Sequence, residues 1–528
     1  MEGFRGVRRA ALELGRTSVL IGENGSGKSS LLDALALLLG AAAPGIQPSD
    51  FHRPSPGRGS GPIRIAAGLR ETRPGEWSSG RLAALGEEAG GSRPGIELRF
   101  TAEPDPGDLP AGWSLHGSDG RTLDPALVEP VKAALPLIQV RGGLIVEHRG
   151  PRDEEAPAAE ARSPEGAREQ LERRVESHYR KLVESHAVLS PRELRAGFDA
   201  ARALLERAPE RLLAGALRPY GLAEEFRERQ RSRGVRAGSG AQSIGLLLLL
   251  GALLEAPGSE VAAGTEPILV FEEPETHLHP LTLASVWELI EGVRLQKIVT
   301  THSPELLSAV PLRALRRLAR SGGDVTVWRM GHAALDRDER RRVRYHIRAR
   351  RGGALFARCW LLIEGETEFW LLPELARLCG YDLEVEGIEC VEFAQCGVAP
   401  LVKLAEQLGI GWHLLADGDH AGRSYAASAV EVAGEVPERI TKLKEPDVEH
   451  CLWHQGYAEV YLKASGEPSA RRRRPRSVIE RAVRRSSKPV LALSVLEAMR
   501  RDGAPGIPRA LRNAVEAAVR QARASRAS

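Results

Sequence analysis

The sequence predicts an α/β protein with two successive parallel-sheet regions, and three observations support this. A glycine-rich turn joins an apolar strand (18–21) to a leucine-rich helix (31–39) near the start of the chain. Two short strands, 266–271 and 296–300, follow a long helical stretch. A further strand–helix pattern begins at Cys359. Strands that alternate with helices in this way form mostly parallel sheets.

Size and composition indicate a soluble globular protein of two to four domains. The chain has 528 residues, of which 42% are hydrophobic and 27% charged. Five cysteines without a CxxC pair predict neither a zinc knuckle nor a disulfide framework, so we expect a reducing cytoplasm. No signal peptide precedes the first strand, and the apolar run 244–254 is too short to span a bilayer. We therefore expect no membrane partner.

Positive charge is concentrated at the end of the chain. Residues 465–528 hold 16 Lys and Arg against 5 Asp and Glu, whereas the whole chain carries a net charge of only +4. Such a basic region favours a polyanion partner, to which the run Arg471–Arg474 and Arg476 would supply phosphate contacts. The alternative is a solvated basic tail without a specific partner.

The order of patterns predicts four segments. Residues 1–165 are expected to form the first part of an α/β region that contains the glycine-rich turn, 166–235 a helical insert, 236–353 the second part of that region, and 354–528 a separate α/β domain with the basic region. Residues 1–16 predict a strand and a turn before the glycine-rich turn. Short strands at 63–69, 96–100, 113–116 and 137–140 predict antiparallel additions beside the sheet of the first region.

The helical insert follows a linker-like stretch at 151–166. Leu171, Val175, Tyr179 and Leu182 recur at steps of three and four among dense charges. A narrow apolar stripe of this kind packs against a partner helix, either its own or that of another subunit. We expect the insert to contribute to a homodimer.

The turn at residues 22–29 has the spacing of a P-loop, Gly22-x4-Gly27-Lys28-Ser29. Glycines let successive backbone N–H groups point into one concavity, and the following helix presents its N-terminus to phosphate. Lys28 is expected to reach the β- and γ-phosphates, and the Ser29 hydroxyl to bind Mg²⁺. The predicted ATP-binding residues are Asn24, Gly25, Gly27, Lys28, Ser29 and Ser30.

Three later segments supply the remaining parts of an ATP site. Glu272 and Glu273 follow a buried strand, so we expect Glu272 near Mg²⁺ and Glu273 to polarise the attacking water. His302 follows the next strand and is expected to hydrogen-bond the γ-phosphate, although a single histidine there can be structural. Ser239 and Gly240 lie in a Ser/Gly turn before an apolar helix, another anion-binding N-terminus.

Together these four elements resemble the ABC-type ATPase head. In that class the Ser/Gly turn of one subunit closes over ATP held by the other. The resemblance therefore implies a homodimer through the ATPase head, with ATP sites completed by the second subunit.

Acidic residues follow two strands of the second region. Glu364 directly follows the strand 359–363, and Glu368 lies one helical turn later. Asp417 and Asp419 follow the strand 412–416. Four carboxylates at neighbouring strand ends repel one another unless cations lie among them. Oxygen ligands favour Mg²⁺ or Mn²⁺, and two such ions about 4 Å apart are suited to phosphodiester displacement.

Asp447 and Glu449 follow at a suitable distance to add metal ligands, although an ordinary acidic turn is an alternative. The ordered acidic pairs resemble the Toprim domain. An ABC-type head fused to a Toprim module resembles the OLD (overcoming lysogenisation defect) family of ATP-dependent endonucleases. The resemblance implies metal-dependent nicking or cleavage of DNA by a homodimer that its ATPase regulates. It further implies that Lys488, in a Lys-Pro pair, stabilises the scissile phosphate.

Members of this family occur in phage defence and DNA maintenance, and a helicase-like partner is conceivable. Three alternatives remain at this point. A RecF- or SMC-like DNA-binding ATPase explains residues 1–330 but not the later acids. A topoisomerase needs a nucleophilic tyrosine that none of the seven tyrosines matches. A primase would usually bring a zinc module, which the cysteines do not provide.

Overall fold

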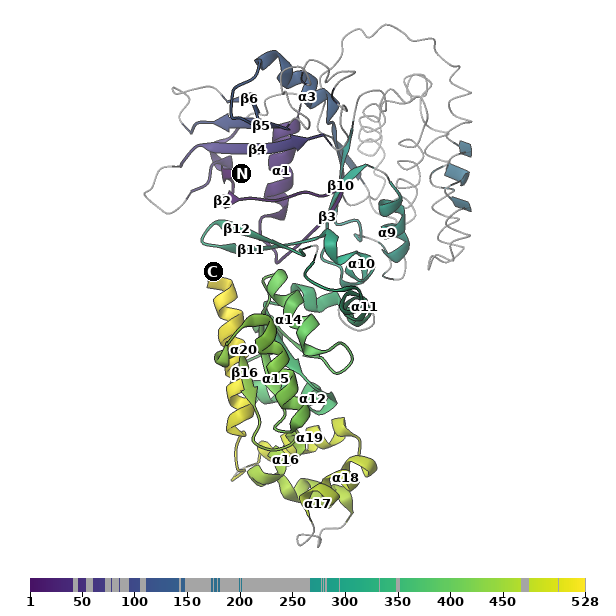
Figure 1. The fold of residues 1–528 in the computed structure, drawn as a ribbon, viewed down its shortest axis with the longest axis vertical. Helices are drawn as coiled ribbons and strands as arrows, with labels where there is room; N and C mark the ends of the chain where they lie inside the picture. The colour runs from purple at the N-terminus through teal and green to yellow at the C-terminus, as the bar shows by residue number, and fades with distance from the viewer. Residues whose placement is uncertain are drawn as a thin grey trace, which may run out of the picture. The chain divides into compact units, whose positions relative to one another are not determined.

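In the computed structural model the chain divides into two compact units, Met1–Val327 and Trp328–Ser528 (Figure 1). The structure describes residues 1–40, 46–53, 60–71, 77, 85, 95–104, 111–141, 144–147, 172–173, 175–177, 179–180, 199, 201, 266–276, 278, 280, 283–293, 295–331, 333–347, 352–466, 474–501 and 503–527. Several predictions lie outside these residues: the turn with Ser239 and Gly240, most of the helical insert, the apolar run 244–254, and Arg471–Arg473.

The described part of the first unit is built on one sheet, whose twelve strands have the order β6-β5-β4-β1-β2-β12-β11-β3-β10-β9-β7-β8. Its strands are β1 (Glu2–Phe4), β2 (Val7–Ala10), β3 (Thr17–Ile21), β4 (Ile63–Arg70), β5 (Gly95–Ala102), β6 (Gly112–Gly117), β7 (Leu137–Arg141), β8 (Leu144–Glu147), β9 (Ile268–Glu272), β10 (Gln296–Thr300), β11 (Leu315–Ser321) and β12 (Asp324–Arg329).

The centre of this sheet is parallel. β10 pairs in parallel with both β3 and β9, and Thr300 lies level with Leu20 on one side and Glu272 on the other. These strands are apolar and buried on both faces, as expected for a parallel sheet covered by helices. Their carboxyl ends therefore meet at one edge, where the glycine-rich turn also begins.

Strand β7 differs from the prediction. The stretch 137–140 was expected to be an antiparallel addition, but β7 pairs in parallel with β9. Leu137, Ile138 and Val140 are almost fully buried, so this strand belongs to the covered centre of the sheet. An apolar run of four residues does not by itself distinguish these two positions.

The strands β4, β5 and β6 form the predicted antiparallel extension. Buried residues alternate with exposed ones along β4 and β5, which is typical of a sheet with one covered face. Helix α1 (Lys28–Leu39) packs against β4 and β5 (Figure 1), and the Trp113 indole donates a hydrogen bond to the Leu38 carbonyl (3.0 Å). The other described helices of this unit are α3 (Val128–Ala134), α9 (Leu283–Gly292) and α10 (Pro304–Ala309).

The second unit contains a parallel sheet of four strands in the order β14-β13-β15-β16, among the residues described. The strands are β13 (Cys359–Ile363), β14 (Ile388–Glu392), β15 (Gly411–Ala416) and β16 (Ile440–Lys442). The chain moves from β13 to β14 in one direction and from β14 to β15 in the other. Right-handed crossovers then place the connecting helices on opposite faces of the sheet.

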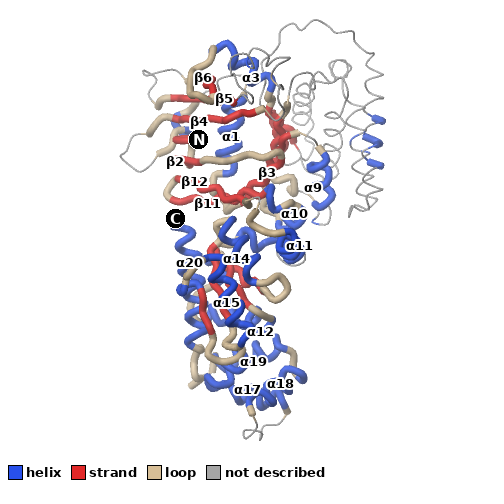
Figure 2. Tube along the Cα trace, in the orientation of Figure 1, coloured by secondary structure: helices blue, strands red, loops and turns tan. Residues whose placement is uncertain are grey.

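Helices enclose this sheet, as Figure 2 shows. α14 and α15 pack together beside β15, whereas α20 packs along β13 and β15 and against α12. The described helices are α11 (Arg337–His346), α12 (Glu366–Leu378), α13 (Leu383–Glu386), α14 (Val398–Gln407), α15 (His420–Ala433), α16 (Val448–Leu452), α17 (Ala458–Ser465), α18 (Pro475–Arg485), α19 (Lys488–Met499) and α20 (Arg509–Ala527).

No helix among the described residues has the length and the apolar character needed to cross a bilayer. All five cysteines carry free thiols, and four of them are buried. In Cys359, for example, burial raises the pKa of the thiol far above its usual range. The buried thiols therefore act as small apolar side chains in the core of the second unit.

Candidate nucleotide and metal sites

The glycine-rich turn adopts a backbone that only glycine accommodates readily. Gly22, Gly25 and Gly27 all have positive φ angles, of 152°, 77° and 100°. A Cβ on Gly22 would lie 2.5 Å from the Leu318 carbonyl oxygen. Helix α1 begins directly afterwards at Lys28, so its free N–H groups face the concavity of the turn.

Lys28 lies buried inside this turn. Its Nζ donates to the carbonyl oxygens of Gly22 (2.8 Å) and Glu23 (3.0 Å), and burial lowers its pKa to about 8. Two neutral carbonyl groups compensate an ammonium charge poorly compared with a phosphate. The lysine is thus positioned to exchange these contacts for phosphate oxygens.

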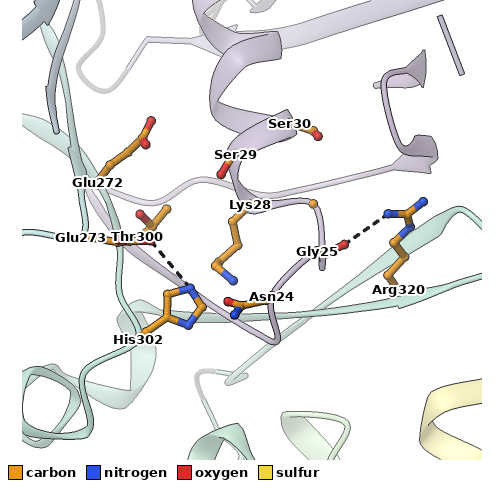
Figure 3. A pocket seen from close by; sticks show the side chains of 11 residues that line it. Asn24, Gly25, Lys28, Ser29, Ser30, Glu272, Glu273, Thr300, His302 and Arg320 are labelled. Atoms are coloured by element: carbon orange, nitrogen blue, oxygen red, sulfur yellow. Dashed lines mark hydrogen bonds and ion pairs between the residues drawn. The ribbon is translucent and has the colours of Figure 1, made fainter. Parts of the chain in front are cut away.

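The predicted ATP-site residues of the first unit, apart from the turn at 239–240, line one pocket (Figure 3). Its lining residues are Asn24, Gly25, Gly27, Lys28, Ser29, Ser30, Glu272, Glu273, Thr300, His302 and Arg320. Glu272 is 6% exposed, and its carboxylate accepts a hydrogen bond from the Gln139 amide of β7. His302 Nε2 lies 3.9 Å from a Glu273 carboxylate oxygen, and burial together with the Lys28 charge lowers the histidine pKa.

Three residues near this pocket were not predicted from the sequence. Gln139 is a buried amide between the apolar residues Ile138 and Val140 of β7, and this interruption of an apolar run was detectable in the sequence. Glu275 accepts hydrogen bonds from the Thr301 hydroxyl (2.8 Å) and from the His302 backbone N–H (2.7 Å). Its other carboxylate oxygen is buried without a hydrogen-bond partner. Glu275 therefore fixes the segment that carries His302.

Arg320 is the third residue. It lies on β11 and donates to the Gly25 carbonyl oxygen (3.3 Å), on the other side of Lys28 from His302 in Figure 3. Its side chain is exposed, and no described acidic side chain forms an ion pair with it. An arginine in an arginine-rich strand gave no sequence signal for this position.

In the second unit the acidic residues gather at the point where the chain order of the strands reverses. Glu364 follows β13 and Glu368 lies in the first turn of α12, whereas Asp417 and Asp419 follow the neighbouring strand β15. Ligand crevices of α/β sheets form at such switch points. We call the space at these strand ends the acidic crevice.

Burial and mutual repulsion dominate the electrostatics of the acidic crevice. Glu368 is 6% exposed, and burial raises its pKa to about 8, with the charges of Glu449 and Glu364 adding to the shift. Burial also raises the Asp417 pKa to about 8, reinforced by Glu368 and Glu364. The Glu364 pKa is raised by burial and by Asp419. Carboxylates held together in this way gain from a bound cation.

Local backbone features hold the acids in place. Asp419 caps α15, because its side chain accepts from the Gly422 N–H (2.7 Å). A Cβ on Gly418 would lie 2.4 Å from the Glu445 carbonyl oxygen, so only glycine lets the segment with Glu445 pass so close. The Gly418 N–H donates to that oxygen (2.9 Å), which ties the β15 end to the loop before α16.

Asp447, Glu449 and Lys488 also lie at the acidic crevice. Asp447 caps α16, and Glu449 is buried, with one carboxylate oxygen accepting from the Thr367 hydroxyl (2.8 Å) and lying 3.3 Å from Lys488 Nζ. Burial opposes the charge of Lys488, but Glu449 and Glu368 outweigh it, so the Lys488 pKa is raised. Thr367, which orients Glu449, was not predicted.

The side chains of the acidic crevice offer the kind of ligand atoms that hard divalent cations prefer. These atoms are carboxylate oxygens, and a Glu364 oxygen is buried without a partner. Within the described part of the chain, however, no three His, Cys, Asp or Glu side chains stand in ready ligand geometry. A cation bound here would therefore require the carboxylates to move closer together.

The protein comparisons assign the family. Residues 1–354 match the model of a family described as a protein of unknown function, DUF2813, and residues 355–419 match the Toprim domain of overcoming lysogenization defect protein-like proteins. The chain belongs to the DUF2813 family and is an OLD-like protein. The predicted resemblance and fold class, an ATPase head region followed by a Toprim α/β domain, are confirmed.

This OLD-like protein is 35% identical over 541 residues to Uncharacterized protein YbjD of Escherichia coli (strain K12), covering 97% of this chain and 96% of the relative. The C-terminal region of the Burkholderia pseudomallei OLD protein matches with 19% identity, 30% of this chain, 96% of that chain and a TM-score of 0.27. The SMC head domain from Thermotoga maritima matches with 14% identity, 62% and 97% coverage and a TM-score of 0.32. Scores this low add no argument of their own.

Proposed function

We propose that this OLD-like protein is a metal-dependent DNA endonuclease whose ATP-binding head regulates cleavage. The observation that carries the proposal is the acidic crevice. Six carboxylates lie together with one lysine, and three of the carboxyl groups have raised pKa values. Glu368 and Glu449 are buried, and divalent cations would relieve the repulsion among the six groups in their ionised form. The family match to an OLD-like Toprim domain agrees with this chemistry.

In the proposed site the chain's own groups have separate tasks. Glu364, Glu368, Asp417 and Asp419 would hold two Mg²⁺ or Mn²⁺ ions, with Asp447 and Glu449 completing their surroundings. The bound ions would supply an activated water and stabilise charge on the leaving oxygen. Lys488 would contact the scissile phosphate, and the exposed arginines of α18 would hold the strand through its phosphates.

The head is proposed to bind ATP with Mg²⁺ through Lys28, Ser29 and Glu272, and to hydrolyse it with Glu273 and His302. We further propose a homodimer through the head and the 166–235 insert, in which Ser239 and Gly240 of one subunit close over ATP of the other. A cytoplasmic protein fits the five free thiols. A role in phage defence or DNA maintenance, with or without a helicase-like partner, is consistent with this activity.

Conversion of supercoiled plasmid to nicked or linear DNA tests the proposal. The full chain should cut with Mg²⁺ or Mn²⁺ and not with EDTA. Asp417→Asn should cleave the plasmid at least about 100-fold more slowly, because an amide is a much poorer ligand for these ions than a carboxylate. Glu431→Gln makes the same carboxylate-to-amide change at an exposed position of α15 and should cut like the original. Metal-independent nicking, or equal nicking by Asp417→Asn, would refute the nuclease.

A second candidate is a DNA-binding ATPase that does not cut. It is favoured by one observation, the lack of three described side chains in ready metal-ligand geometry. Tight DNA binding with ATP turnover and no cleavage under any divalent ion would select this candidate.

A further inference from the structure

Helix α11 presents a stripe of arginines to solvent. Arg337, Arg340, Arg341 and Arg344 are all exposed and follow the spacing i, i+3, i+4 and i+7, so they share one face of the helix. Glu339, Val343 and His346 are buried on the other face. Tyr345, at the end of the stripe beside Arg341, is 66% exposed. We call these four arginines and Tyr345 the α11 stripe.

The positive charge of the α11 stripe is not neutralised by the helix itself. The buried Glu339 pairs with Lys403 of α14 (2.7 Å), away from the arginines. The Asp336 side chain caps the helix by accepting from the Glu339 N–H (2.8 Å), and Asp338 is the one exposed acid of the helix. Arg340 donates to the Leu335 carbonyl oxygen (3.0 Å), and among the described residues none of the four arginines pairs with a carboxylate. Four guanidinium groups therefore remain available to an anionic partner.

The helix that carries the stripe is held firmly. Asp336 and Glu339 form a reciprocal capping box at its start, and α11 packs against α14 in the same unit as the acidic crevice. From Arg337 to Arg344 the helix rises about 10 Å, which corresponds to about three phosphates of one DNA strand measured along the duplex axis. Guanidinium groups bind phosphate through paired N–H donors, and a tyrosine hydroxyl also donates to phosphate oxygens.

We propose that the α11 stripe is a docking surface for the phosphate backbone of duplex DNA. The proposal rests on the proposed function, since it adds a second DNA contact to a chain that cuts DNA. A membrane surface fits less well, because a membrane-bound helix exposes a broad apolar face, whereas Val343 and Ile347 of this segment are buried. The α11 stripe lies outside the basic region 465–528, whose arginines are the other predicted DNA contacts.

The test measures binding of a fluorescent 30-base-pair duplex to the full chain in EDTA, over a range of salt concentrations. Arg337→Gln/Arg341→Gln should weaken binding about tenfold and reduce the slope of log affinity against log salt by about two, since each phosphate contact contributes about 0.9. Arg9→Gln/Arg64→Gln removes two exposed arginines from β2 and β4 and should retain the original affinity and slope. Unchanged melting temperatures show that each variant is folded.

Equal affinity and slope in the α11 variant and the original chain would overturn the inference, as would an equal loss in the Arg9/Arg64 control. Loss of binding to anionic vesicles with unchanged binding to DNA would also overturn it and assign the stripe to a membrane. Cleavage is measured separately on plasmid. A chain that binds DNA through α11 and never cuts would refute the proposed function and leave this inference standing.

Discussion

The nucleotide pocket and the acidic crevice occupy corresponding places in two parallel sheets, yet they have opposite electrostatics. Both lie where a strand ends and a helix begins. In the first, burial of Lys28 lowers the pKa of an ammonium to about 8. In the second, burial of Asp417 and Glu368 raises the pKa of two carboxyl groups to about 8. At each site burial thus disfavours the charged form of a side chain, and a ligand of the opposite sign would favour that form.

This difference separates two contributions: the fold provides an accessible site, and the side chains determine which ligand suits it. The carboxyl edge of a parallel sheet supplies access and helix N-termini in both units. At the first edge, glycines and a lysine make the place suitable for phosphate. At the second, carboxylates make it suitable for divalent cations. The same backbone position therefore does not predict the ligand, whereas the residues at the strand ends do.

Removal of the key charge at each site is expected to have the largest effects, and it shows whether the two sites act independently. Lys28→Ala should reduce ATP hydrolysis about 100- to 1000-fold, because it removes a preorganised cation at the transferred phosphate. It should leave Mn²⁺ binding at the acidic crevice within twofold of the original. Asp417→Asn should do the reverse. A loss of both properties in either variant would show that the two sites are not independent.

Substitution of Glu275 is expected to have a smaller effect, confined to the nucleotide pocket. Glu275→Ala should lower the kcat of ATP hydrolysis about tenfold with little change in KM, because the backbone and hydroxyl groups around His302 lose their shared acceptor. Glu275→Gln keeps an acceptor oxygen and should retain most of the rate. If both variants fall equally, the carboxylate acts by its charge and does not position His302.

The pH dependence of nucleotide binding sharpens the comparison further. A bound phosphate favours the charged form of Lys28, so binding takes up a proton wherever the free lysine is neutral. Since its pKa in the free protein is about 8, affinity should be flat from pH 7 to 8 and fall up to about tenfold per pH unit above that. Calorimetric titration with a non-hydrolysable ATP analogue measures this; a flat profile to pH 9.5 contradicts it.

Arg320 should have the smallest effect. Its exposed guanidinium lies at the pocket beside Gly25 and is screened by water. Arg320→Ala should therefore weaken nucleotide binding about threefold, and Arg320→Lys less than that. Arg316 is buried in the same strand and bonded to the Glu13 carbonyl, so it offers no matched control. Arg313→Ala, at an exposed position before the start of β11, should leave affinity unchanged.

The sequence was sufficient for those parts of both sites that follow an apolar strand directly. Glu272, Glu364 and Asp417 stand at the ends of strands that their composition identifies, and Lys28 belongs to a motif with fixed spacing after such a strand. The placement of each pair at the edge of its own sheet could therefore be predicted. The roles assigned to them remain proposals. Lys488 was proposed from the family resemblance of its Lys-Pro pair, and the structure places it beside Glu449.

Residues that act through a distant part of the chain were not predicted. Gln139 reaches Glu272 only because β7 pairs with β9, across a separation of 133 residues. Thr367 bonds to Glu449, 82 residues away, and Arg320 reaches the P-loop because β11 lies beside β3. These contacts depend on strand order and helix packing, which local patterns do not specify. The α11 stripe could not be recognised from the sequence, because a run of charged residues does not reveal which of them pair with acids elsewhere in the chain.

Binding of Mn²⁺ to the full chain without nucleotide tests the central claim most directly. Electron paramagnetic resonance titration counts bound ions while the nucleotide pocket lacks the phosphates that it needs to hold a metal. The account predicts saturable Mn²⁺ binding that Asp417→Asn weakens at least tenfold and Glu431→Gln leaves unchanged. Absence of binding to the original chain, or equal binding to Asp417→Asn, would contradict it.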